Sequence, residues 1–180
     1  MKDSEATDRV TAWIAGDTKA FSELVDRHGD AVYNLAYRMC GNRAVAEDIA
    51  QETFIRAHQR RHQYKPAYPL RNWLLAICAN RCRSRYRGWR RARDTEQAFA
   101  EAQAMERESQ PWDHEMSEQR IALEQALMSL PETLRAPIVL RYMEGMSIQE
   151  VADTLRLRLS AAKMRLTRGR DWLREIMQKS

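Results

Sequence analysis

Charge is distributed along this chain in blocks of opposite sign, and one block contains no acidic residue. Residues 53–93 hold twelve Lys or Arg and neither Asp nor Glu. By contrast, residues 1–52 carry six basic and ten acidic side chains, residues 94–134 carry two and ten, and residues 135–180 carry ten and five. A chain of 180 residues can form one domain or two small ones. The alternation of charge favours two, joined by the acidic stretch 94–116.

Few residues interrupt helices in this sequence, which favours an all-α fold. It contains six Gly and five Pro, and β-branched residues are sparse. Apolar spacing predicts helices over about 7–39 with a break near Gly16, over 43–60 and 70–87, and in several segments from 117 onward. Tyr142 and Trp172 are among the residues expected to face inward. We therefore expect two small helical domains, residues 1–93 and 117–180, with 94–116 as a linker that is either a fraying helix or a flexible segment.

The pattern from 147 to 170 predicts a helix-turn-helix. Ser147 and Glu150 fit a capping box, in which the serine accepts from the amide three residues on and the glutamate reaches back. After a turn at 156–159, Ser160 is expected to cap a last long helix with an exposed basic face. A second helix of this kind enters the major groove of DNA. The alternative is an αα-hairpin with a basic exposed face.

Aromatic residues occur throughout the acid-free block, residues 53–93. Basic and aromatic side chains together are suited to binding single-stranded nucleic acid. The aromatic residues are Tyr64, Tyr68, Trp73, Tyr86 and Trp89. Cations neutralise phosphates, and exposed rings stack on bases at ~1–3 kcal/mol each. The alternative is a solvated helix face. For Trp73 the spacing to Leu74 and Ile77 favours a core tryptophan over a base-stacking one.

Two sets of segments carry a resemblance to a known family: 126–135, 140–152 and 163–166 in the second half, and 46–55 and 72–80 in the first. The first set resembles the C-terminal domain and the second the N-terminal domain of bacterial sigma factors, and the most similar group is the compact extracytoplasmic-function (ECF) group. The resemblance covers about residues 10–92 and 117–177. It implies an initiation subunit that binds core RNA polymerase, recognises a bipartite promoter and helps open it. It implies no active site and no cofactor.

The same resemblance assigns roles to particular residues. Those implied to dock on the β′ coiled coil of RNA polymerase are Asp48, Gln51, Glu52, Phe54 and Ile55, which could otherwise be an ordinary acidic helix surface. Those implied to melt and read the −10 element are Tyr64, Lys65, Tyr68, Trp73, Asn80, Arg81, Arg83 and Arg85. Those implied to read the −35 element as duplex are Ser160, Ala161, Lys163, Met164, Arg165, Thr167 and Arg168.

The chain departs from the family pattern at a few positions. The usual turn glycine is Arg156, and the usual Gly-Thr-Val before Lys163 is Ser-Ala-Ala at 160–162. His58 replaces a usual tryptophan and Leu70 a usual phenylalanine. Glycine tolerates positive φ, whereas arginine adopts it at an energetic cost. These changes leave the predicted fold intact but weaken any transfer of −35 sequence preference.

The three cysteines are better explained as core thiols than as a functional site. Cys78 and Cys82 lie four apart on one predicted helix and could meet Cys40 in a metal or redox site. No CxxC motif or Cys/His cluster with zinc spacing exists, so we expect small buried thiols. The histidines are scattered, and a surface role is expected for them: His28, His58, His62 and His114.

The sequence also bounds location, partners and rival functions. No run of eighteen apolar residues exists and the N-terminus is too polar for a signal peptide, so a cytoplasmic protein is expected. The resemblance implies three partners: core RNA polymerase through its β′ and β subunits, promoter DNA, and an anti-sigma factor that could hold the protein at the inner membrane. A stand-alone helix-turn-helix regulator is the first rival, but it leaves the acid-free block unexplained. A nucleic-acid-modifying enzyme is the second, and the sequence lacks zinc-deaminase, Walker-loop and clustered-carboxylate motifs.

Overall fold

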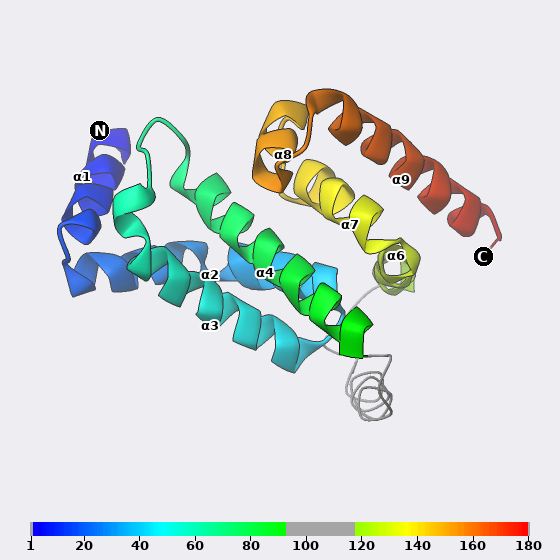
Figure 1. Ribbon diagram of the computed structural model, residues 1–180, viewed down its shortest axis with the longest axis horizontal. Helices are drawn as coiled ribbons and strands as arrows, with labels where there is room; N and C mark the ends of the chain where they lie inside the picture. Colours follow the sequence, from blue (N-terminus) through cyan, green and yellow to red (C-terminus); the bar gives the residue numbers. More distant parts are fainter. Residues whose placement is uncertain (1, 93–117, 180) are drawn as a thin grey trace.

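The computed structural model describes residues 2–92 and 118–179, and within them the chain is all-α with no strand (Figure 1). The first half consists of α1 (Lys2–Ile14), α2 (Thr18–Cys40), α3 (Arg43–Gln59), the 3₁₀ turn η1 (Arg61–Gln63) and α4 (Leu70–Ala92). The second half consists of α6 (Glu118–Ser129), α7 (Glu132–Ile138), the π-helical turn η2 (Val139–Met143), α8 (Ile148–Leu155) and α9 (Leu159–Lys179). The predicted all-α class is confirmed. Both interpretations of the 94–116 linker lie outside the described residues.

Local capping explains where the first helices begin and end. The Asp17 side chain accepts from the amides of Lys19 at 2.8 Å and Ala20 at 3.1 Å, which starts α2 after the predicted break. Gly41 ends α2 with φ 71, and the Asn42 side chain then accepts from the backbone of α3. Such caps stabilise a helix by about 1 kcal/mol each, and they fold α3 back along α2.

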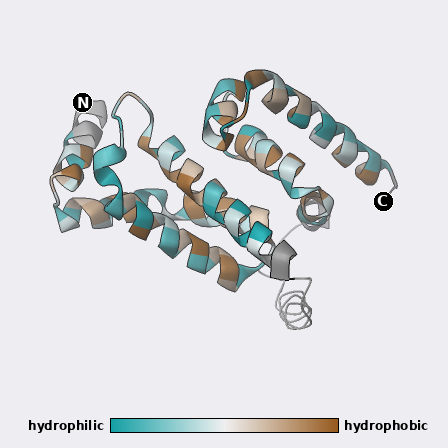
Figure 2. Cartoon of the chain, in the orientation of Figure 1, coloured by the Kyte–Doolittle hydropathy of each residue, from teal (hydrophilic) through white to brown (hydrophobic). Residues whose placement is uncertain are grey.

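The first half is a bundle of α2, α3 and α4, with α1 across one end. Its apolar side chains pack into a shared core. Hydrophobic and hydrophilic residues alternate along each helix (Figure 2). An aromatic cluster seals the end near α1: Trp13 is 1% exposed, its ring centroid lies 6.1 Å from that of Trp73, and its Nε1 donates to His58 Nδ1 at 3.4 Å. The core interpretation of Trp73 is therefore confirmed. The expected surface role of His58 is wrong, because this ring is half-buried against Phe21 in the cluster.

The second half contains the predicted helix-turn-helix in α8 and α9. The capping box is present: the Ser147 hydroxyl accepts from the Glu150 amide at 3.2 Å, and the Glu150 carboxylate accepts from the Ser147 amide at 2.7 Å. Arg156 ends α8 in the left-handed region, with φ 54 and ψ 48. One detail differs from expectation: α9 begins at Leu159, so Ser160 lies inside its first turn instead of capping it.

Two residues expected to face inward are exposed. Tyr142 is 54% exposed because the chain widens into a π turn after Pro137, and the extra residue rotates the helical face. Trp172 is 42% exposed. Here α9 approaches α7 so closely that a Cβ on Gly169 would lie 2.7 Å from Ile138, and Leu173 takes the inward position beside this contact.

The two halves pack directly against each other. Helix α4 runs beside α8, and the C-terminal end of α2 contacts α6 and α7 (Figure 1). Buried residues from Trp13 in the first half to Leu166 in the second form one continuous hydrophobic cluster. The division of the chain at residues 93 and 117 stays a prediction. Because the halves pack in this way, surfaces of α4 and α8 face each other.

Candidate nucleic-acid interface

The predicted polymerase-docking residues lie on α3, and most of them are exposed. Asp48 and Gln51 lie on the solvent face, and the Ile55 side chain is 56% exposed, which is unusual for isoleucine. Glu52 is half-buried at the edge of this face. Phe54 is only 8% exposed, so its predicted place on the docking surface is corrected. Its ring packs in the core because position 54 falls on the inward stripe with Val45 and Ile49.

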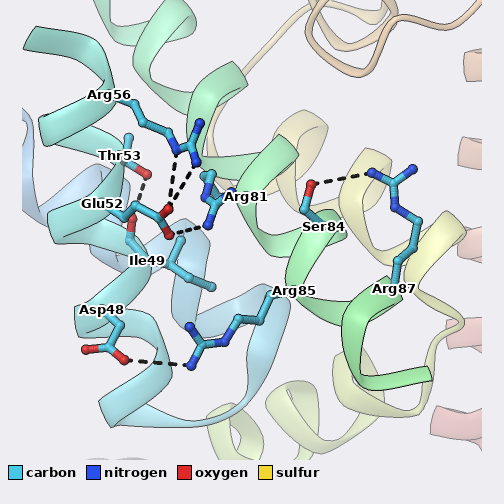
Figure 3. Close-up of polar contacts among 9 residues, drawn as sticks. All are labelled: Asp48, Ile49, Glu52, Thr53, Arg56, Arg81, Ser84, Arg85 and Arg87. Carbon is cyan, nitrogen blue, oxygen red and sulfur yellow. Dashed lines mark hydrogen bonds and ion pairs between the residues drawn. The ribbon is translucent and has the colours of Figure 1, made fainter. Parts of the chain in front are cut away.

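Arginines of α4 pair with the acids of α3 (Figure 3). Glu52 accepts from Arg56 at 3.3 Å and from Arg81, and Asp48 lies 3.8 Å from Arg85. Partial burial of Glu52 opposes its ionisation, but the hydrogen bonds and charges of Arg81 and Arg56 outweigh burial and lower the pKa of this carboxyl. Two arginines predicted to hold DNA are thus tied to two acids predicted to bind polymerase. These ion pairs link α3 to α4, so the predicted polymerase-binding and DNA-binding surfaces adjoin each other.

The loop between η1 and α4 presents two of its predicted DNA-binding residues to solvent. Tyr68 is 61% exposed and Lys65 is also exposed. Tyr64 is 9% exposed, and its hydroxyl donates to the Tyr68 carbonyl at 2.6 Å. Its ring lies 5.4 Å from that of Trp73. Direct base contact by Tyr64 and Trp73 is therefore corrected: their rings are held in the aromatic cluster, where they support the loop that carries Tyr68.

On α4, one predicted DNA-binding side chain, that of Arg83, reaches the second half. Arg83 donates to Asn80 Oδ1 at 3.2 Å and to the Leu155 carbonyl of α8 at 3.2 Å. The side chains of Asn80 and Arg83 are half-buried. In this arrangement the C-terminal half of the molecule therefore covers part of the predicted −10 surface.

A buried ion cluster holds the same interface and was not predicted. The Glu144 side chain is 3% exposed and accepts from Arg38 of α2 at 3.2 Å and from Arg71 of α4 at 2.5 Å. Beside it, the Asn72 amide donates to the Glu150 carboxylate of α8 at 2.5 Å. These partners are 73 to 106 positions apart, so no local sequence signal indicates the pairs. The available hint is that Arg71 and Glu144 are charges beside apolar runs.

A second unpredicted anchor is Arg135 at the start of the C-terminal half. It donates to the carbonyls of Met39 at 2.7 Å, Met128 at 2.6 Å and Leu130 at 2.9 Å. Burial lowers the pKa of this guanidinium. One side chain thus closes the C-terminal end of α2 against α6 and α7.

The predicted −35 residues lie along the first three turns of α9. Five are exposed, namely Ser160, Lys163, Met164, Thr167 and Arg168, whereas Ala161 and Arg165 are half-buried. They share one face because residues three and four apart are neighbours on a helix. This face is a basic strip at the start of the second helix of the motif, the part that enters a major groove in helix-turn-helix proteins.

The cysteines meet in the interior between α2 and α4. Cys78 and Cys82 are buried, and the Cys78 thiol donates to the Val32 carbonyl at 3.5 Å. A hydrogen bond with Cys82, followed by burial, raises the pKa of Cys40 far above its ordinary value. Neutral buried thiols of this kind behave as small apolar side chains, as the core interpretation requires. Among the described residues, no group of three or more His, Cys, Asp or Glu is arranged to hold a metal ion.

Over the parts of the chain that the structure covers, no helix is both long and apolar enough to traverse a bilayer.

Known proteins match both halves. Residues 24–92 match the family Sigma-70 region 2, and residues 120–173 match Sigma-70 region 4. The chain is 37% identical to the ECF RNA polymerase sigma factor SigE of Mycolicibacterium smegmatis, over 97% of this chain and 69% of the relative. It is 33% identical to the ECF RNA polymerase sigma factor SigW of Bacillus subtilis, over 94% of this chain and 95% of the relative.

A solved structure gives the same result in three dimensions. The structure of CnrH in complex with the cytosolic domain of CnrY superposes with a TM-score of 0.70 and 26% identity, over 96% of each chain. The relatives span both halves, and the two matched regions stand in the same order as the predicted −10 and −35 surfaces. The chain therefore belongs to the ECF sigma factors, the subunits that direct RNA polymerase to promoters.

Proposed function

We propose that this sigma factor binds core RNA polymerase through the exposed face of α3, with contacts to the β′ and β subunits. The observation that carries this proposal is the exposed Ile55 beside Asp48 and Gln51, on a helix whose other faces are buried. An exposed apolar residue within a charged rim is typical of a protein interface. The protein acts as a subunit in this proposal, without catalytic turnover.

The test is a pull-down of core polymerase with Asp48→Arg and Ile55→Ala. Both side chains are exposed, and the ion pair of Asp48 with Arg85 is long and solvent-exposed at 3.8 Å, so folding is expected to be unchanged. Asp30→Arg on α2 is the matched control, because it makes the same charge change at another exposed position. We expect at least tenfold weaker binding for the α3 variants and no change for the control. Equal affinity in all three variants would contradict this assignment.

We further propose that the loop carrying Lys65 and Tyr68 engages the −10 element as a single strand. Tyr68 offers an exposed ring for stacking, and Lys65 a nearby cation for phosphate. The Tyr64 hydroxyl holds the loop backbone at Tyr68, which fixes where this ring points. Arg83 and its partner Asn80 join the same surface once α4 and α8 separate, since Arg83 is now bonded to the Leu155 carbonyl of α8.

For the −35 element we propose duplex readout by the exposed strip of α9. Lys163 lies in the second turn of α9, at a depth suited to base edges, whereas Arg168 lies more than two turns from the start and is placed for phosphates. An anti-sigma factor is also proposed as a partner. Its support is the structural relative CnrH, which was solved in complex with the cytosolic domain of CnrY.

A further inference from the structure

A cavity of about 300 Å³ lies where the two halves meet. Helix α4 contributes Arg83 and Arg87 to its wall, the turn after α8 contributes Arg156, and α9 contributes Arg165. Apolar atoms of α7 and α8 complete the wall. Four arginines from three separate segments therefore line a space large enough for a small molecule.

The cavity carries an excess of positive charge. Glu132 is the single acid among the described residues that line it. Burial lowers the pKa of Arg83, Glu132 partly offsets this, and the nearby Arg87, Arg165 and Arg156 lower it further. One Glu132 oxygen is buried without a hydrogen-bond partner, so none of the four arginines donates to that oxygen. A wall with four arginines and one acid favours an anionic ligand.

Arg156 supplies an independent observation. It is the one non-glycine residue with positive φ in the described part of the chain. A residue with a Cβ pays an energetic penalty in this left-handed conformation that glycine does not. Backbone strain of this kind is concentrated at functional sites. Glycine would fit the turn better, but it would remove a guanidinium from the cavity.

We propose that this cavity is a binding site for a small phosphorylated molecule that carries at least two negative charges. The proposal goes beyond promoter recognition. Arginine forks match phosphate oxygens, and charge-assisted hydrogen bonds are the strong ones. Because Arg87 belongs to one half and Arg156 to the other, a bound ligand holds the halves together. The ligand therefore stabilises the arrangement in which Arg83 is bonded to both Asn80 and the Leu155 carbonyl of α8, and it opposes binding of the −10 strand.

A DNA backbone is the main competing ligand, since Arg83 and Arg165 also belong to the predicted promoter surfaces. The geometry favours the small anion. The four arginines line one cavity because α4, α7, α8 and α9 are packed together, and this cavity has the volume of a small molecule. A duplex cannot enter a space of this size between packed helices.

The experiment is calorimetric titration of the full chain with inorganic pyrophosphate at constant ionic strength. Arg156→Gly and Arg87→Gln test the two sides of the cavity. Arg158→Gly is the matched control. It makes the same substitution two positions along the chain, and the Arg158 side chain does not line the cavity. We expect saturable binding by the native chain, a roughly tenfold or greater loss for each cavity variant, and less than twofold for the control.

Arg156→Gly also separates binding from folding. Relief of the left-handed strain should raise Tm by roughly 2–4 °C while the affinity falls. Parallel titrations with inorganic phosphate and with ATP distinguish a bare phosphate site from a nucleotide site. The proposal is wrong if pyrophosphate gives no more binding heat than sodium chloride of equal ionic strength. It is equally wrong if Arg158→Gly loses as much affinity for pyrophosphate as Arg156→Gly. It is also wrong if Arg156→Gly weakens binding of promoter duplex but leaves pyrophosphate binding unchanged.

Discussion

Arg71 donates twice to Glu144 across the interface between the halves, to its carbonyl at 3.0 Å and to its carboxylate at 2.5 Å. Arg38 reaches the same carboxylate from α2. Breaking a buried ion pair by removing one partner costs about 3–5 kcal/mol, because the remaining charge stays buried and unpaired. This acid, held by two arginines, is thus one of the polar contacts that join the halves.

Charge reversal at this acid should open the molecule. We predict that Glu144→Lys places three cations together, separates α4 from α8 and increases the radius of gyration measured by small-angle X-ray scattering. Exposure of Asn80 and Arg83 should then increase affinity for single-stranded −10 DNA. Glu47→Lys is the control, since Glu47 forms only an exposed pair with Arg43. An unchanged radius for Glu144→Lys would show that apolar packing alone holds the interface.

The capping box of α8 should give an acid-sensitive contribution to stability. The Ser147 amide and hydroxyl lower the pKa of Glu150 below its ordinary 4.5; burial opposes them, and the hydrogen bond from Asn72 adds a smaller lowering effect. A carboxyl with a depressed folded pKa stabilises the fold above its unfolded pKa, and this contribution is lost as pH falls through the folded value.

We therefore predict that Glu150→Ala lowers the free energy of unfolding by about 1 kcal/mol near neutral pH. The difference from the native chain should shrink as pH falls below 4.5. Urea unfolding followed by circular dichroism across this pH range measures it. A difference that is independent of pH would mean that the Glu150 charge contributes nothing to the cap.

Substitutions of two nearby tyrosines should have different effects, one on DNA binding and the other on the stability of the loop. Tyr68→Ala should weaken binding of a single-stranded −10 oligonucleotide by ~1–3 kcal/mol with no loss of stability, because its ring is exposed. Tyr64→Phe should lose the hydrogen bond to the Tyr68 carbonyl and destabilise the fold by about 1 kcal/mol. Fluorescence anisotropy and thermal unfolding of both variants provide the comparison. If Tyr68→Ala binds the oligonucleotide normally, the loop does not stack on bases.

Two basic residues of α9 should act differently on promoters. Lys163→Ala should reorder affinities across a panel of −35 variants by ~1–3 kcal/mol, because base-edge contacts depend on sequence. Arg168→Ala should weaken every duplex by a similar factor, as phosphate contacts do. The opposite pattern would mean that α9 enters the groove in a different orientation.

Features that depend on neighbouring residues could be predicted from the sequence. The break at Gly16, the end of α2 at Gly41 and the Ser147 capping box are local patterns, and each is present in the structure. The outward turn of Tyr142 could not be predicted by helical periodicity, because a π turn changes the period. The spacing of Phe54 with Val45 and Ile49 predicted its burial, whereas the resemblance implied a place on the docking surface.

Features that depend on tertiary packing could not be predicted from the sequence. Glu144 meets Arg71 across 73 positions, and Arg135 meets Met39 across 96. The cavity likewise needs Arg87 and Arg156, whose proximity depends on the packing of α4 on α8. The charge blocks predicted a cationic surface on α4, but the contact of that surface with the second half depends on tertiary structure alone.

The measurement that tests the central claim most directly is in vitro transcription with purified core RNA polymerase on a library of promoter sequences. We predict that core polymerase plus this protein produces transcripts from a defined subset that shares a −10 and a −35 motif, while core polymerase alone does not. Asp48→Arg should abolish this activity without changing helicity. Transcription that is identical with and without the protein across the library would contradict its role as a promoter-recognition subunit.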